Sequence, residues 1–182
     1  MTQQIPNAAF FNQVDLDRIE TSRLILRPPV YSDGPGLHEL LSDADICRYS
    51  PFPPFTNIAN TQFAIVEWRE KRAQGLRTYV GATRSDPRTP IGFLQVGADE
   101  ELGGVISPRK SGDGIATEAL QVVIAALELR NAWTIIDAEH SGLIHTLEKV
   151  NIIQEKALPK YRIHPQISPE KRDCVLLRQQ ST

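Results

Sequence analysis

Hydrophobic and polar positions change period twice along the chain, and the middle of the chain has the short runs typical of β-strands. Three strand-like runs follow one another at 77–84 (RTYVGATR), 91–97 (IGFLQVG) and 101–107 (ELGGVIS). The segment SDPRTP, residues 85–90, has the composition of a turn, and ADE separates the second run from the third. The pattern therefore predicts an antiparallel meander of three strands.

Helical spacing of apolar residues precedes the meander in two segments. Residues 32–43 (SDGPGLHELLSD) place three leucines on one side after a cap-like Ser-Asp pair, and Gly-Pro-Gly confines the predicted helix to the later residues. A second helix is predicted from Thr56, as its cap, to about Gln74, with Gly75 as its stop. The residues expected on its buried face are Ala59, Phe63 and Val66.

A third helix is predicted directly after the meander. From Gly114 onward, apolar residues recur at helical spacing: Ile115, Ala119, Val122, Val123, Ala126 and Leu127. A strand at 133–138, a helix at 141–150 capped by Ser141, and strands near 152–161 and 174–179 complete the pattern. The polar segment 162–173 is predicted as a loop between the last two strands.

The order of these elements indicates the α+β class. A strand at 22–28 precedes the helices, and strands and helices then mix, which favours one mostly antiparallel sheet with helices on its faces. Residues 1–20 are expected to be an irregular N-terminal extension, and residues 21–182 a single domain.

Composition and charge exclude several classes of function. The net charge is −2, and charges of both signs are scattered along the chain. The sequence contains no basic stripe of the kind that binds nucleic acid. No apolar run approaches the length of a membrane span, and the N-terminus does not resemble a signal peptide. The two cysteines, Cys47 and Cys174, have no metal-binding spacing, so we expect a reduced cytoplasmic protein without a metal site.

The segment between the third strand of the meander and the next helix has the features of a phosphate-binding loop. It contains Arg109, Lys110, Ser111, Gly112, Asp113 and Gly114. A helix start offers unpaired N–H groups and a positive dipole end, and glycines allow phosphates to approach the backbone. The segment matches neither the Walker pattern nor the dinucleotide fingerprint, so a plain loop-to-helix junction is about as consistent with it as a pyrophosphate site.

The spacing Arg-x-x-Gly-x-Gly followed by IATEA resembles the acyl-CoA pyrophosphate loop of the GNAT N-acetyltransferase superfamily. The segments ETSRLILRP, RYSPFPP, PIGFLQV, ELGGVISPR and LEKV occur in the order found in the branch that acetylates ribosomal-protein N-termini and in its small-molecule relatives. The resemblance covers about residues 20–155. It implies a splayed central sheet, acetyl-CoA as co-substrate, a peptide or small-molecule amine as acceptor, and it allows a homodimer.

The resemblance also implies roles for individual residues. The pantetheine arm of the cofactor would pair with the backbone of Val105, Ile106 and Ser107, and the N–H of Ile106 would polarise the thioester carbonyl. The pyrophosphate would lie on the loop and on the backbone of Ile115 and Ala116, and His140 would also contact the cofactor. Glu101 is the expected base, which the amine requires because it must lose a proton before it attacks; Asp99 and Glu100 are alternatives, and an exposed turn carboxylate is nearly as consistent with Glu101.

The sequence departs from the family pattern where relatives carry hydroxyl donors. Leu143 and Leu147 occupy those positions and are more consistent with a core role. Ser141, His140 and Tyr161 are nearby substitutes for a general acid, although each suits a structural role better. These departures keep a second hypothesis open, a non-catalytic acyl-CoA-binding module of the same fold.

Aromatic residues of the helical half are candidates for the acceptor cleft. Tyr49, Phe52 and Phe55 lie in a proline-rich loop, and Trp68 lies in the helix that follows. We expect Tyr49, Phe52 and Trp68 to contact the acceptor, although aromatic residues at this spacing are more often part of a core.

Overall fold

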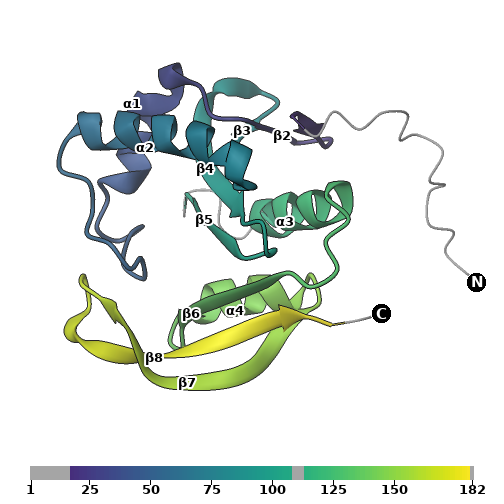
Figure 1. Ribbon diagram of the computed structural model, residues 1–182. Coiled ribbons are helices and arrows are strands. Elements are labelled where there is room, and N and C mark those ends of the chain that lie inside the picture. Colours follow the sequence, from purple (N-terminus) through teal and green to yellow (C-terminus); the bar gives the residue numbers. More distant parts are fainter. Residues whose placement is uncertain (1–16, 108–112, 181–182) are drawn as a thin grey trace, which may run out of the picture.

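A computed structural model describes residues 17–107 and 113–180 (Figure 1). The elements are β1 (Ile19–Glu20), β2 (Leu24–Arg27), α1 (Gly34–Leu41), α2 (Ile58–Lys71), β3 (Arg77–Thr83), β4 (Asp86–Val96), β5 (Leu102–Ile106), α3 (Ile115–Ala126), β6 (Trp133–Asp137), α4 (Ser141–Glu148), β7 (Ile152–His164) and β8 (Ser168–Gln179). They form two antiparallel sheets, β1-β2-β3-β4-β5 and β6-β8-β7. The predicted α+β class and the β3–β4–β5 meander are confirmed.

Helices cover both faces of the larger sheet. Helices α1 and α2 pack on one face through a cluster made of Leu37, Leu40, Leu41, Ile65, Val80 and Phe93. Helix α3 packs on the other face, and its buried residues share a larger cluster with strands of both sheets, including Leu94 of β4 and Leu177 of β8. One core therefore joins the two sheets, although they share no regular strand ladder (Figure 1).

Among the described residues, one backbone bridge links the two sheets, which then diverge. Glu101 and Trp133 form one parallel bridge, where the N–H of Trp133 donates to the carbonyl of Glu100 at 3.2 Å. Beyond the bridge, β5 belongs to the first sheet and β6 to the second, so that the strands separate toward their carboxyl ends (Figure 1). This is the splayed sheet that the resemblance implied, and we call the space between β5 and β6 the opening.

Two strand boundaries differ from the sequence prediction. The segment 162–173, predicted as a loop, forms the end of β7 and the start of β8, with Arg162 paired to Arg172. Strand β4 likewise begins at Asp86, inside the predicted turn. Strand β7 is the outer strand of its sheet and is mostly exposed, so its polar residues conceal the strand pattern.

The buried face of α2 also differs from the prediction. Thr61, Ala64 and Ile65 are its buried residues, whereas Phe63 is 70 % exposed. Thr61 can be buried because its hydroxyl is 2.9 Å from Nδ1 of His38, which satisfies a polar group that no apolar pattern would reveal. The N-cap is Asn57 rather than Thr56, and Gly75 ends the helical segment in a left-handed conformation, as expected.

The N-terminal part of the described chain is more regular than predicted. Ile19–Glu20 pair with β2, although irregular structure was expected up to residue 20. Helix α1 begins at Gly34, earlier than expected, and the side chain of Asp33 does not cap it. Asp33 is instead buried in an ion pair with Arg27, at 2.7 and 2.8 Å. Within residues 17–107 and 113–180, no helix is long and apolar enough to cross a membrane.

Candidate active site

The edge of β5 that faces the opening carries backbone groups that the ladder with β4 does not use. Ser107 N–H donates to the carbonyl of Ile91 at 2.8 Å, and Gly97 N–H donates to that of Glu101 at 2.9 Å, both within the pairing with β4. Because backbone groups alternate in an antiparallel ladder, residues 101, 103, 105 and 107 use theirs toward β4, and residues 102, 104 and 106 direct theirs toward the opening. Of the predicted set, Ile106 thus faces the opening, whereas the backbones of Val105 and Ser107 face β4.

Gly104 is a distorted position on this edge. Its φ is +144°, and a Cβ there would lie 2.3 Å from the carbonyl oxygen of Phe93, so only glycine fits. Gly104 and Ile106 are two residues apart on the same side of β5, which gives the opening two backbone N–H groups about 7 Å apart.

The start of α3 lies beyond the end of β5 and leaves three N–H groups without a helical acceptor. Glu118 N–H donates to the carbonyl of Gly114 at 2.9 Å, which is the first bond of the helix, so Ile115, Ala116 and Thr117 precede the ladder. Gly114 is the N-cap, with φ +73° and no side chain to occupy these donors. The predicted contacts of Arg109, Lys110, Ser111 and Gly112 lie outside the described residues; Asp113 and Gly114 lie at the helix start, as expected.

The three acids before β5 have different surroundings. The carboxylate of Glu100 accepts N–H groups of Arg130 at 3.0 Å and Asn131 at 2.6 Å, and thereby holds the α3–β6 connection. Asp99 accepts the N–H of Glu101 at 3.3 Å, which shapes the turn. The carboxylate of Glu101 is exposed and has no hydrogen-bond partner among the described residues, so of the three it is the one free to act on a substrate.

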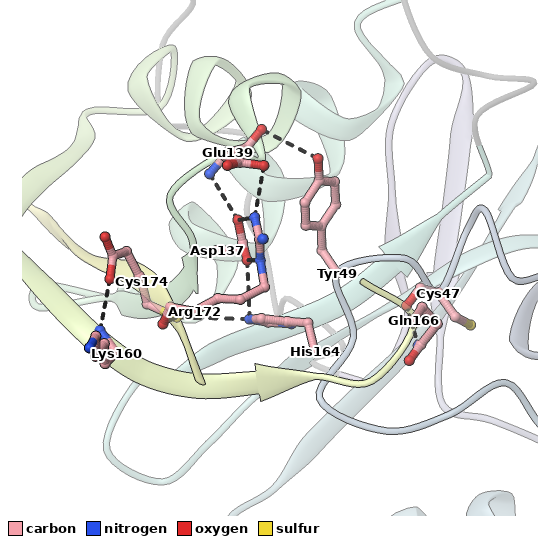
Figure 2. Close-up of polar contacts among 10 residues, drawn as sticks. Cys47, Tyr49, Asp137, Glu139, Lys160, His164, Gln166, Arg172 and Cys174 are labelled. Atoms are coloured by element: carbon pink, nitrogen blue, oxygen red, sulfur yellow. Dashed lines mark hydrogen bonds and ion pairs between the residues drawn. The ribbon is translucent and has the colours of Figure 1, made fainter. Parts of the chain in front are cut away.

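Tyr49 and His140 meet at the carboxyl end of β6. Their rings stack with centroids 4.3 Å apart. The Tyr49 hydroxyl is 3.4 Å from the carbonyl of Glu139 (Figure 2). Burial lowers the pKa of His140, against the raising effect of nearby Asp137, so the ring is neutral near pH 7. The structure therefore places the residue expected at the acceptor, Tyr49, against the one expected at the cofactor, His140.

Phe52 and Trp68, the other residues expected at the acceptor, are partly buried and pack against the cluster that α1 and α2 form with the larger sheet. Trp68 lies against Phe93 with ring centroids 4.7 Å apart, and Phe52 lies against Phe55 at 5.8 Å. Trp68 also lines a surface hollow of about 310 Å³ together with Arg69 and Arg72. The packing gives both residues a structural role, and their contact with an acceptor stays a prediction.

Sequence comparison decides the family. The family model of the GNAT acetyltransferase domain matches residues 23–152, which is most of the chain. The chain belongs to the GNAT acetyltransferase family. No curated protein matches it in sequence.

Solved structures of other GNAT proteins share this fold. The chain is similar to a GNAT acetyltransferase from Bacillus anthracis, with 19 % identity over 88 % of this chain and 96 % of that one and a TM-score of 0.74. RimL, a ribosomal L7/L12 alpha-N-protein acetyltransferase solved with coenzyme A, is 15 % identical over 89 % and 97 %, with a TM-score of 0.79. Spermidine N-acetyltransferase from Vibrio cholerae, solved with CoA and spermine, is 18 % identical over 87 % and 95 %, with a TM-score of 0.70.

At the carboxyl end of β6, this GNAT domain has a charge network around a buried aspartate that the sequence analysis missed (Figure 2). Asp137, at the end of β6, is fully buried and accepts from Nε of Arg172 at 2.6 Å. The same guanidinium is 2.7 Å from Glu139, and Nε2 of His164 lies 3.7 Å from Asp137. Burial alone would raise the pKa of Asp137, but hydrogen bonds from Arg172 and the N–H of Glu139 hold it below the usual range. Only the spacing Asp137-x-Glu139 hinted at this cluster.

The tip of the β7–β8 hairpin holds the loop that carries Tyr49. Nε2 of Gln166 donates to the carbonyls of Cys47 at 2.6 Å and Phe52 at 2.7 Å. Cys47 itself is a free, fully buried thiol whose pKa is raised by burial. These two hydrogen bonds fix the loop between α1 and α2 to the C-terminal sheet on both sides of Tyr49. They thereby hold Tyr49 beside the opening.

The candidate general acids are not brought together. Leu147 is 2 % exposed and Leu143 packs beside the same core, in agreement with the core role expected for both. Tyr161 is on β7, which β8 separates from β6 and the opening. Ser141 is the first residue of α4, and the N-cap of this helix is His140. The predicted capping role of Ser141 is therefore wrong. Of these candidates, His140 lies at the carboxyl end of β6, where it stacks on Tyr49.

Proposed function

We propose that this GNAT domain transfers the acetyl group of acetyl-CoA to a primary amine by direct attack in a ternary complex. The observation that carries the proposal is the divergence of β5 and β6 beside the uncapped start of α3. The opening offers free strand N–H groups for an amide-bearing chain, and the helix start offers N–H groups for phosphates. Free cysteines at positions 47 and 174 fit a cytoplasmic location.

The acyl donor would be held by the backbone more than by side chains. Its pantetheine amides would pair with the edge of β5 at Gly104 and Ile106, and its pyrophosphate would lie on the N–H groups of Ile115 and Ala116 and on the basic loop before them. A glycine at 114 suits this role, because a side chain there would stand between the helix start and the phosphates. His140 would border the same opening from the β6 side.

Glu101 is the proposed base for the incoming amine. It lies five residues from Ile106, about 16 Å along an extended strand, and three residues from Gly104, about 10 Å. A thioester carbonyl polarised by the N–H of Gly104 would therefore be nearer to Glu101 than one at Ile106. We assign both N–H groups to the pantetheine arm and its thioester, with water molecules joining Glu101 to the amine.

The acceptor would enter beside Tyr49, from the face of the sheet that α1 and α2 cover. Neighbouring structures include enzymes named for ribosomal-protein N-termini and for spermidine. A peptide N-terminus or a small-molecule amine therefore remains the proposed acceptor class.

Acetyl-CoA at 100 times its dissociation constant should raise the free energy of unfolding by about 2.7 kcal/mol. For a domain of this size, that corresponds to a rise of roughly 5–10 °C in melting temperature. Thermal denaturation with and without the ligand measures this shift, and release of free CoA thiol in the presence of a panel of amines then tests transfer. Absence of any shift at millimolar acetyl-CoA would contradict the proposal.

Replacement of Gly114 separates phosphate binding from a plain helix junction. Gly114→Asp should weaken CoA binding about tenfold or more, since a carboxylate would face the phosphates. Gly114→Asn introduces a side chain of the same size as aspartate, and asparagine tolerates the left-handed backbone without adding charge. The asparagine variant should therefore bind CoA more tightly than the aspartate variant. Calorimetric titration compares them, and equal, unchanged affinities in the two folded variants would show that the helix start does not bind phosphate.

The burial of Leu147, where relatives carry a hydroxyl donor, favours one alternative, a non-catalytic acyl-CoA-binding module. Release of CoA thiol distinguishes the enzyme from the binding module. Binding of acetyl-CoA without thiol release against any amine would identify the module, whereas release with one amine identifies the enzyme.

A further inference from the structure

The first turn of α3 is tied to the segment before β2 by a network of side chains. Nε of Arg23 donates to Glu118 at 2.6 Å, and its Nη1 donates to the backbone carbonyl of Asp113 at 2.7 Å. The hydroxyl of Thr21 donates to the other carboxylate oxygen of Glu118. Residues 90 or more positions apart in sequence thus meet at the proposed phosphate site.

The two ends of the network are themselves fixed. The hydroxyl of Thr21 accepts the N–H groups of Arg23 at 3.1 Å and Leu24 at 2.9 Å, which anchors it to the turn that begins β2. Glu118 contributes both its carboxylate and its N–H, which donates to the carbonyl of Gly114. Burial alone would raise the pKa of Glu118, but hydrogen bonds from Thr21 and Arg23 lower it, so this carboxylate is ionised near pH 7.

We propose that Arg23, held by Glu118 and Thr21, is a positioning residue that sets the backbone of Asp113 and Gly114 and so aims the first N–H groups of α3 at the pyrophosphate of the acyl donor. This inference rests on the proposed function. Arg23 acts on the carbonyl side of the peptide, opposite the donors, and its own guanidinium is occupied by Glu118 and Asp113. Its role is therefore geometric, and it does not itself carry charge to the phosphate.

The network joins two segments that resemble the family and lie far apart in the sequence. Thr21 and Arg23 belong to ETSRLILRP, and Glu118 belongs to the IATEA that follows the loop. Gly114 has φ +73° and, as a glycine, has no side chain that could stabilise this conformation. A Cβ added at this position would have Nη2 of Arg23 as its nearest neighbour, at 3.8 Å. The hydrogen bonds of Arg23 to Glu118 and to the carbonyl of Asp113 therefore constrain the backbone at Gly114.

The test compares two ligands that differ in the pyrophosphate. Arg23→Ala should raise the dissociation constant of CoA roughly tenfold, because the charge-assisted bonds that fix the helix start are lost. The dissociation constant of pantetheine, which lacks the pyrophosphate, should stay within about twofold. Calorimetry measures CoA binding, and ligand-observed NMR measures pantetheine binding.

Arg18→Ala is the matched control. Arg18 is also an exposed arginine, but its guanidinium is bound to Glu20, and it is not among the residues that line the hollow beside Arg23, Asp113 and Ile115. The variant removes the same charge, so CoA affinity should change less than twofold. Glu118→Gln, which keeps the side-chain shape and removes the ion pair, should weaken CoA in the same selective way if Arg23→Ala folds poorly.

Three outcomes separate the inference from the proposed function. Wild-type protein that binds no CoA would overturn both. Wild-type binding with unchanged CoA affinity in folded Arg23→Ala would overturn the positioning role alone. Equal losses for CoA and pantetheine would also overturn it, because they would indicate a general structural defect.

Discussion

Replacement of Arg172 by leucine should lower the free energy of unfolding by about 3–5 kcal/mol at pH 7. Arg172 is the guanidinium that compensates the fully buried carboxylate of Asp137, at 2.6 and 3.3 Å. Its removal leaves a buried charge whose remaining partners are the N–H of Glu139 and His164 at 3.7 Å. Urea unfolding followed by circular dichroism measures the loss.

The effect should depend on pH with a definite sign. In the wild type the pKa of Asp137 lies below the unfolded value of about 3.9, so its contribution is present above that pH and is lost as pH falls. Without Arg172, burial would raise the pKa of this carboxyl, so the native state would take up a proton more readily than the unfolded chain. The stability difference between the two proteins should therefore narrow from pH 6 to pH 3.

Two further variants control this prediction. Arg178→Leu removes an arginine from the same strand, β8, where its partner Glu155 is exposed, and should cost at most about 1 kcal/mol. The double variant Asp137→Leu with Arg172→Leu removes both charges and should recover much of the loss. Equal losses for Arg172→Leu and Arg178→Leu would show that the buried network is not a major source of stability.

The parts of this fold that could be predicted are those in which burial follows a local period. Strands β3 and β4 lie between helices, so their apolar runs are visible in the sequence. Helix α3 buries Ile115, Ala119 and Val123 on one face, and Gly114 marks its start as expected. Strand β7 could not be predicted over its full length, because an outer strand needs little apolar surface.

Contacts between distant polar residues could not be predicted from period or composition. Asp137 and Arg172 are 35 positions apart, and Arg23 and Glu118 are 95 apart. Each looks like an ordinary surface charge in its own segment, and only the fold pairs them. The resemblance made the loop before α3 and Glu101 candidates for the site, but the neighbours of Glu101 are set by the bridge to Trp133, which no local pattern reveals.

Glu101→Gln should lower kcat/KM for the amine by about 10²–10⁴ at the acidic end of the profile, if Glu101 is the base. A protonated amine has no lone pair, and amines of the proposed acceptor class have pKa values of about 8 to 10.4, so a base matters most where few molecules are already neutral. The wild-type rate should rise with pH and level off. The variant should approach the wild type as pH rises, because solvent then supplies the neutral amine. Measurement of kcat/KM from pH 6 to pH 9.5 with one amine gives both curves.

Glu100→Gln is the control for this change. Its carboxylate holds the N–H groups of Arg130 and Asn131, so the variant should lose stability and keep the shape of the pH profile. The thiolate leaving group has a pKa of about 8.5 and can depart without a protein acid, which is consistent with the buried Leu147. The profile should therefore lack a descending alkaline limb. An alkaline limb that disappears on replacement of His140, Ser141 or Tyr161 would identify a general acid, and a profile that Glu101→Gln leaves unchanged would assign the base to Asp99 or to solvent.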